Sequence, residues 1–263
     1  MSLDAVTPSH LSYLMLILCG YLAIRLVYRY DLYEKEHSLM ALIAVALGYG
    51  SALLVERTEG WIYNQLGERA GLIAVQAGVA ASNEESAKLL IVVAIALIAR
   101  RQFNDPLDGL VYGSLAGLGM AIEEALHFWR AGGANQLLIG EHLIRVFGHL
   151  VMGGIIGFPI GLIWARARGA FFMLPGSMLG AMSLHFLWDV IAEWQPPTPT
   201  WGRIRLGAAA ATILGGMLFY GFLCEIGARH SYRVHGRGKR LSLLDWPFTL
   251  FLRRSADGAS QRE

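Results

Sequence analysis

Several of the longest apolar runs of this sequence contain side chains that can carry protons or bind a metal ion. An ionisable residue inside a membrane segment costs roughly 2.5–3.5 kcal/mol on insertion scales, so it is rare unless it faces a cavity and has a function. Such residues lie near one end of four successive runs: Glu84, Glu85, Lys88, Glu123, Glu124, Arg145, His149, His185 and Asp189. Carboxylates and imidazoles together predict a site for acid–base catalysis, metal binding or proton transport.

The first group is Glu84-Glu85-Ser86-Ala87-Lys88. Residues four apart share a helix face, so we expect Glu84 to pair with Lys88. Glu85 is then rotated by about 100° and is the freer carboxylate. We therefore predict Glu85 as the base and Glu84 as its structural neighbour. The structural alternative is a helix start, where acidic residues favour the positive end of the helix dipole.

Two histidines lie in the later runs. His185 and Asp189 are four apart, so the Asp189 carboxylate can hold one ring nitrogen and fix the tautomer of the other, or both residues can be direct metal ligands. His149 follows Arg145 by one turn. Arg145 can stabilise an oxyanion or simply neutralise Glu141, and the second interpretation is the stronger one.

The elements that position these residues follow from composition. The chain has 263 residues, of which 55% are hydrophobic and 16% charged, and its mean hydropathy is +0.45. A helix needs about 20 mostly apolar residues to cross a bilayer. We predict an all-α, polytopic transmembrane helical bundle with about seven spans: Leu11–Tyr28, Ser38–Val55, Glu84–Ile98, Leu107–Trp129, Glu141–Ala165, Ala170–Trp194 and Leu206–Ile226. The mixed segment Gly60–Ser82 is expected to lie in the interface or to re-enter the membrane.

Basic residues cluster in every second loop and in the tail: Arg25, Arg29 and Lys35, then Arg100 and Arg101, then Arg166 and Arg168, then Arg229, Arg233, Arg237, Lys239 and Arg240. The positive-inside rule places these loops and the C-terminus in the cytoplasm and the N-terminus outside. Arg203 and Arg205 argue weakly against this orientation. The N-outside orientation brings the ionisable residues of four spans to a similar depth in the outer leaflet, which predicts one shared site. Glu123 and His127 are expected either to line this site or to lie at the membrane interface.

Glycines recur every four residues in the fourth and fifth spans, at Gly109, Gly113 and Gly117 and at Gly153, Gly157 and Gly161. This spacing lets helix backbones approach closely, so we expect these two spans to pack tightly. The formal net charge of only +2 gives no reason to expect a nucleic-acid partner.

Three motifs on successive spans carry a resemblance to a known family. Glu84–Lys88 reads EExxK, His185–Asp189 reads HxxxD, and Met120–Glu124 matches FxxxE with methionine in place of phenylalanine. Gly148-His149, before a glycine-rich stretch, resembles a further family histidine. Over about Asn83 to Asp189, the sequence resembles the PrsW family of intramembrane proteases, which is distantly similar to the CAAX-protease family.

The outer-leaflet depth of the ionisable residues suits a reaction near the extracytoplasmic side of the membrane. The resemblance implies an intramembrane endopeptidase that cleaves a membrane-anchored protein or peptide there, in a bacterial cytoplasmic membrane. It assigns catalysis to six residues and support to Lys88 and Arg145. The six are Glu84, Glu85, Glu124, His149, His185 and Asp189. In one route, His149, His185 and either Glu124 or Asp189 bind zinc while Glu85 takes a proton from water. In the other, a glutamate and a histidine activate water without a metal. The absence of an HExxH motif slightly favours the metal-free route.

Two other interpretations use the same residues. Buried Glu, His and Asp side chains can relay protons in a proton-coupled transporter, and two facing histidines can ligate haem. For domains, we expect a transmembrane protease domain over 1–226, with the motifs in 83–189, and a basic cytoplasmic tail over 227–263. The tail segment Leu241–Arg254 is expected either to form an interfacial helix on the inner membrane face or to be a mobile, solvated end.

Overall fold

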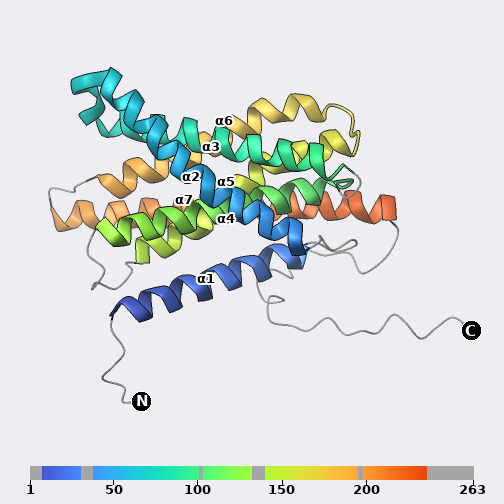
Figure 1. Ribbon diagram of the computed structural model, residues 1–263, viewed down its shortest axis with the longest axis horizontal. Coiled ribbons are helices and arrows are strands. Elements are labelled where there is room, and N and C mark those ends of the chain that lie inside the picture. The colour runs from blue at the N-terminus through green and yellow to red at the C-terminus, as the bar shows by residue number, and fades with distance from the viewer. Residues whose placement is uncertain (1–7, 31–37, 101–102, 132–139, 195–197, 236–263) are drawn as a thin grey trace, which may run out of the picture.

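The computed structural model describes residues 8–30, 38–100, 103–131, 140–194 and 198–235. These ranges form α1 (Pro8–Tyr30), α2 (Ser38–Leu66), the short 3-10 helix η2 (Gly67–Gly71), α3 (Ile73–Ile98), α4 (Pro106–Ala131), α5 (Gly140–Trp164), α6 (Ala170–Glu193) and α7 (Pro199–His235). The described ranges contain no strand, which confirms the all-α prediction (Figure 1). The predicted tail helix Leu241–Arg254 lies outside them.

Five helices, α1, α2, α5, α6 and α7, are long and apolar enough to cross a membrane. In α3, Glu84, Glu85 and Lys88 interrupt the apolar run, and α4 combines many glycines with two glutamates. Helix α4 lies inside the bundle, where 19 of its 26 residues are buried, whereas α3 exposes Leu90 and Ile98 on the outer surface. A helix enclosed by other helices needs no apolar outer face, so the composition of α4 does not mark it as a span, and in α3 the three charged residues have the same effect.

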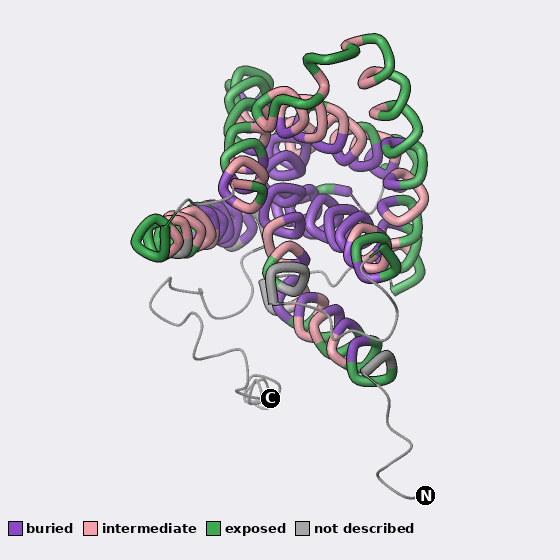
Figure 2. Tube along the Cα trace, turned by 90° about the vertical axis from the view of Figure 1, so that its left-hand side faces the viewer, coloured by how far each residue is buried: buried purple, intermediate pink, exposed green. Residues whose placement is uncertain are grey.

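The outer surface of the bundle is strongly apolar. Phe172 is 84% exposed and Ile98 is 78% exposed, and many leucines of α1, α2 and α6 also face outward. Figure 2 shows buried residues gathered at the centre and exposed residues on the outer faces of the peripheral helices. Apolar surface of this extent marks contact with a membrane in a folded helical chain, because every backbone group is already satisfied within the helices. The chain is an integral membrane protein.

The centre of the bundle is the close pair of α4 and α5. A Cβ atom on Gly109, Gly113 or Gly117 would overlap the backbone of α5, and one on Gly153 or Gly157 would overlap the backbone of α4. The predicted tight packing of these two helices is therefore confirmed. A second close crossing places Gly119 of α4 against the backbone of α2. Helix α4 is thus fixed on two sides before its final turns, which carry Glu123 and Glu124.

The segment Gly60–Ser82 is not a separate element but comprises the end of α2, η2 and the start of α3, and its expected place in the interface or as a re-entrant piece stays a prediction. Helix α2 continues past Val55 to Leu66, and α3 begins at Ile73 rather than at Glu84. In Figure 1 the two helices form a hairpin that extends beyond the rest of the bundle. Gln76 donates a hydrogen bond to the Ala70 carbonyl at 2.8 Å, which holds the turn. Of the polar residues of this segment, Tyr63 and Gln76 line a cavity, whereas Glu68 and Arg69 are exposed.

Helix α7 is longer than predicted, because it runs through the 226/227 boundary to His235. It is tied to the centre of the bundle by a buried hydrogen bond between the hydroxyls of Ser114 and Tyr220, which are 2.9 Å apart. Arg205, near the start of α7, donates to the carbonyls of Ala192 and Trp194 at the end of α6. Its positive charge satisfies carbonyls that the helix end leaves free, so it says little about orientation.

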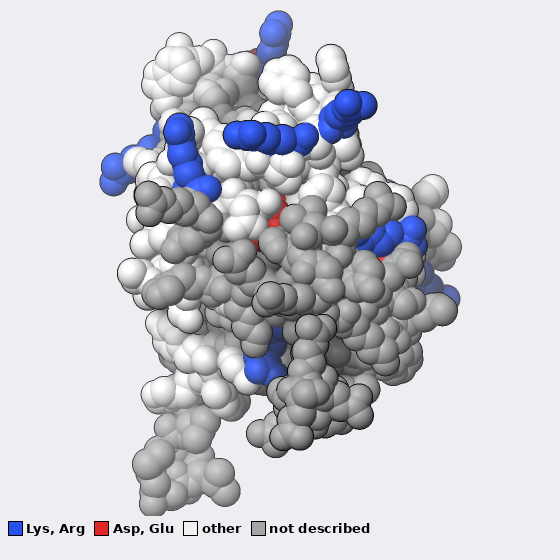
Figure 3. Space-filling model, turned by 90° about the vertical axis from the view of Figure 1, so that its right-hand side faces the viewer, with Lys and Arg blue, Asp and Glu red and all other residues white. Residues whose placement is uncertain are grey.

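Consecutive helices alternate in direction, so α1, α3, α5 and α7 end on the right in Figure 1. Figure 3 shows lysine and arginine side chains on this end of the molecule. The opposite end also carries exposed arginines, among them Arg57, Arg69 and Arg130. The N-outside, C-inside orientation therefore stays a prediction that rests on the loop charges of the whole sequence.

Candidate active site

The structure brings the predicted site residues of four helices into one network. Glu84, Glu85 and Lys88 come from α3, Glu124 from α4, Arg145 and His149 from α5, and His185 and Asp189 from α6. Each of the eight lies within 4.0 Å of another member through side-chain nitrogen and oxygen atoms. The glycine contacts of α4 and α5 fix the distance between Glu124 and His149.

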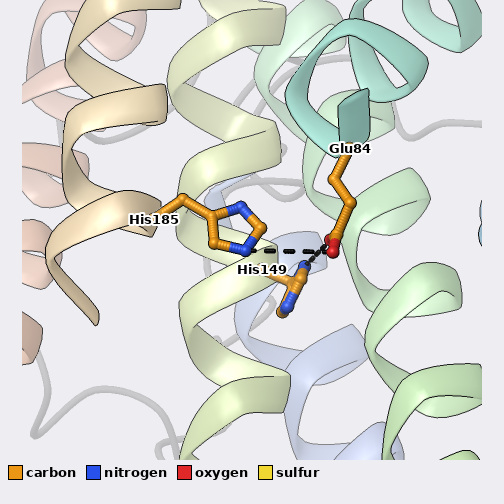
Figure 4. A group of neighbouring side chains, drawn as sticks. All are labelled: Glu84, His149 and His185. Carbon is orange, nitrogen blue, oxygen red and sulfur yellow. Dashed lines mark ion pairs between the residues drawn. The ribbon is translucent and has the colours of Figure 1, made fainter. Parts of the chain in front are cut away.

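Glu84 lies between the two histidines (Figure 4). Its Oε2 is 3.5 Å from Nδ1 of His149, and its Oε1 is 3.9 Å from Nε2 of His185. The two rings cross at 77° with centroids 5.2 Å apart, and each histidine is 1% exposed. One donor atom from each of the three residues lies within 4.8 Å of the other two, and we call these residues the Glu84 group.

A carboxylate holds the second nitrogen of each histidine. Nε2 of His149 is 2.8 Å from Oε2 of Glu124, and Nδ1 of His185 is 2.7 Å from Oε1 of Glu85. The hydrogen bond with Glu85 fixes the orientation and tautomer of the His185 ring, as the outer partners of metal-bound histidines do, and the close ion-pair contact with Glu124 favours one orientation of the His149 ring. Nδ1 of His149 and Nε2 of His185 are left to face Glu84.

Two cations, the buried Lys88 and the partly buried Arg145, complete the network. Lys88 donates to Oε1 of Glu85 at 2.5 Å, whereas Oε2 of Glu84 is 3.9 Å away. The predicted ion pair between Glu84 and Lys88 is therefore present, but the prediction that Glu85 is the freer carboxylate is wrong, because Lys88 contacts Glu85 more closely. Arg145 donates to Oε1 of Glu124. The predicted alternative partner of Arg145, Glu141, has a side chain outside the described part of the chain.

Asp189 contacts a different nitrogen from the one expected of an orienting carboxylate. Its Oδ2 lies 3.3 Å from Nε2 of His185, the nitrogen that also faces Glu84, and its side chain is 16% exposed. The orienting contact on Nδ1 comes from Glu85 instead. Asp189 thus contacts the same ring nitrogen of His185 that faces Glu84, and not the opposite nitrogen.

A polar cavity of about 250 Å³ opens beside the network. It is lined on one side by Glu84, Glu124, Arg145 and Asp189, and on the other by residues of the α2–α3 hairpin and the end of α6. These are Glu59, Tyr63, Gln76, Ala77, Ala80 and Glu193, with Phe128 of α4. A second cavity of about 150 Å³ shares Glu84 and Glu124 and reaches Glu123 and His127, which therefore line the site as expected. Water thus has access to Glu84 from a polar space.

The sequence analysis missed the hairpin residues that line the cavity, above all Glu59, Tyr63 and Gln76. In the sequence, only the spacing of these residues could have indicated that they lie together. Glu59 and Tyr63 are four apart and so share a face, provided that α2 is extended through its polar end. Glu193 follows Asp189 by four residues in the same way.

The Glu84 group fits a divalent metal ion. Ligands at about 2.0–2.1 Å from a tetrahedral zinc ion are roughly 3.3–3.4 Å from one another. Glu84 Oε2 and His149 Nδ1 are 3.5 Å apart, close to this spacing, and Glu84 Oε1 and His185 Nε2 are 3.9 Å apart, so His185 would move slightly inward on binding. Neither Glu84 Oε2 nor His149 Nδ1, both buried, has a hydrogen-bond partner among the described residues. Buried polar atoms rarely stay unsatisfied, so their shared direction points to a ligand between them.

Comparison with known proteins agrees with the motifs. Residues 34–220 match the family described as PrsW family intramembrane metalloprotease, which covers α2 to most of α7 and includes every residue of the network. No curated protein and no solved structure matches the chain at a significant level. The match spans well over half of the sequence, and the chain therefore belongs to the PrsW family of intramembrane metalloproteases.

Proposed function

We propose that this protease is a metal-dependent endopeptidase that cleaves a membrane-anchored protein within the membrane, close to its extracytoplasmic side. The observation that carries the proposal is the Glu84 group, in which donor atoms from three helices lie within 4.8 Å of one another. The family match identifies the chain as a protease, so peptide hydrolysis is favoured over proton-coupled transport by the same residues.

Glu84, His149 and His185 would hold the metal ion. Two imidazole nitrogens and one carboxylate oxygen are a ligand set that zinc accepts in catalytic sites, with the remaining position left for water or substrate. When bound, such an ion supplies Lewis acidity toward the scissile carbonyl and makes water nucleophilic at neutral pH. This ligand set and the family description together reverse the slight preference for a metal-free route drawn from the sequence.

The other polar residues then have distinct roles. Asp189 faces the cavity beside His185, so it is placed to accept the proton of an attacking water. Arg145 also lines the cavity and is placed to stabilise the oxyanion of the tetrahedral intermediate. Glu85 is less suited to act as the base, because it is fully buried and its Oε1 already accepts from Lys88 and His185.

The depth of the network supports cleavage inside the membrane. Glu84 follows the start of α3 at Ile73, and His149 follows the start of α5 at Gly140. At 1.5 Å per residue, these side chains lie about 14–17 Å along their helices. His185 and Glu124 lie about 10–12 Å before the ends of α6 and α4 by the same measure. With the predicted orientation, that end of the bundle is extracytoplasmic.

The role proposed for Asp189 gives a first prediction. Asp189→Asn is expected to lower kcat by about 10²–10⁴, the usual contribution of general acid–base catalysis, while bound metal stays unchanged. Glu193→Gln is the matched control, because Glu193 lines the same cavity one turn further along α6. Loss of metal from Asp189→Asn would instead assign Asp189 as a ligand, and full activity would remove it from the mechanism.

The proposed function is tested with the full chain in liposomes and a pooled library of reporters, each anchored by one transmembrane helix. We expect cleavage of a subset of reporters, loss of cleavage on chelation, and recovery on adding zinc. Cleavage positions read by mass spectrometry should fall in the extracytoplasmic half of the reporter helix. Cleavage that continues unchanged after complete metal removal would contradict the metal-dependent mechanism.

A further inference from the structure

Each of the two cations of the network, Lys88 and Arg145, contacts a carboxylate that also contacts one of the two histidines. Lys88 is fully buried and lies 2.5 Å from Oε1 of Glu85, and the same oxygen is 2.7 Å from Nδ1 of His185. We call Lys88, Glu85 and His185 the Lys88 triad. Its cation and imidazole meet at one carboxylate oxygen, with no water-accessible surface on Lys88 or Glu85.

Arg145, Glu124 and His149 form the corresponding Arg145 triad. Arg145 donates to Oε1 of Glu124, and Oε2 of Glu124 is 2.8 Å from Nε2 of His149. The guanidinium also lies over the ring of Phe128, 4.6 Å from its centroid, and the Arg145 side chain is only 11% exposed. A planar guanidinium held from two directions keeps its carboxylate partner in one position.

The triads act on opposite nitrogens of the two rings. The Lys88 triad occupies Nδ1 of His185 and leaves Nε2 toward Glu84, whereas the Arg145 triad occupies Nε2 of His149 and leaves Nδ1 toward Glu84. A carboxylate buried without a cation would be too costly to hold ionised in this position. The cations therefore keep Glu85 and Glu124 as charged partners of the two imidazoles, Glu85 through a hydrogen bond and Glu124 through an ion-pair contact, and these partners keep the rings turned toward Glu84.

We infer that Lys88 and Arg145 are positioning residues for metal binding, each of which aims one histidine of the Glu84 group through its own carboxylate. The inference deepens the proposed function and depends on it, because the ring orientation matters only if an ion lies between the rings. It also separates the two glutamates of the EExxK motif: Glu84 is the ligand, and Glu85 orients His185.

The test is the affinity of the purified full-length protein for Zn²⁺ alone, measured by competition with a fluorescent chelator. Lys88→Met and Arg145→Met are each expected to weaken Zn²⁺ binding by about 10–100-fold, the usual effect of losing an outer partner of a metal site. Arg145→Lys keeps the charge next to Glu124 and should recover most of the affinity. Arg130→Met, which removes an exposed arginine near the end of α4, should leave it unchanged.

A cycle of double variants tests the connection within each triad. Lys88→Met and Glu85→Gln interrupt the same triad, so their combination should weaken binding little more than either single change. This pair also removes both buried charges together, which avoids an uncompensated Glu85 carboxylate if Lys88→Met alone fails to fold. Lys88→Met with Arg145→Met affects both triads, and the two losses should multiply.

The outcomes distinguish the two levels of the proposal. If the wild-type protein binds Zn²⁺ and the folded Lys88→Met and Lys88→Met/Glu85→Gln variants bind it equally well, the positioning role is wrong and the metal site stands. Losses that multiply within one triad would also overturn the inference. If the wild-type protein itself binds no Zn²⁺, the positioning role and the metal-dependent function both fail.

Discussion

Glu84→Gln is expected to lower proteolysis by at least about 10³-fold, because Glu84 is the one carboxylate placed between both histidines. Loss of a metal ligand removes several kcal/mol of transition-state stabilisation, and each 1.4 kcal/mol corresponds to a factor of ten in rate. The measurement is kcat/KM on a cleaved reporter, with bound zinc determined on the same samples. Both should fall together.

Parallel substitution of Glu84 and Glu85 distinguishes a metal ligand from a residue that only orients a ligand. Glu85→Gln should cost only about 10–100-fold, since it weakens the support of His185 without removing a ligand. Glu56→Gln is the matched control: Glu56 lines the smaller cavity, its side chain is 57% exposed, and it is not in the network. If Glu85→Gln lowers kcat/KM more than Glu84→Gln does, Glu85 is the general base, as the sequence alone suggested.

Gly117→Ala is expected to destabilise the protein by about 3 kcal/mol or more, the upper end of the usual cost of overpacking a core. The added Cβ would overlap the carbonyl of His149, and backbone atoms in a helix cannot rotate away as a side chain can. The same change displaces His149 from Glu84, so activity should fall even in the protein that remains folded. Thermal unfolding in detergent and bound zinc measure the two effects.

Gly180→Ala is the control for glycine replacement, because a Cβ at this exposed position of α6 would meet no atom within 4 Å. It should keep both stability and activity. If Gly117→Ala unfolds at the temperature of the wild type and keeps its zinc, the close approach of α4 and α5 is not what places His149.

The sequence predicts the fold well where apolar length determines it. The predicted starts and ends of α1, α4, α5 and α6 agree with the structure to within a few residues. It fails at the α2–α3 hairpin, because Glu59, Glu68 and Arg69 end the apolar run while the helices continue. Hydropathy detects contact with lipid, and a helical segment that lines a polar cavity has no such signal.

The sequence predicts which residues form the site, but not which of their atoms contact one another. Alternating helix directions bring Glu84, Glu124, His149 and His185 to one depth, and this follows from topology alone. Which carboxylate meets which nitrogen depends on side-chain rotamers and on the rotation of each helix about its axis. The choice of Lys88 between Glu84 and Glu85 is such a case, because the residues three and four positions before it are both within reach.

The metal content of the purified protein decides between the two ways in which this site can activate water. Wild-type chain prepared without metal-chelating columns is compared with the His149→Ala/His185→Ala double variant by elemental analysis, together with proteolytic activity. We predict about one zinc ion per chain in the wild type, as expected for a single catalytic zinc site, and none in the double variant. A fully active wild-type preparation that contains no metal would contradict this account and leave Glu84 and a histidine to activate water themselves.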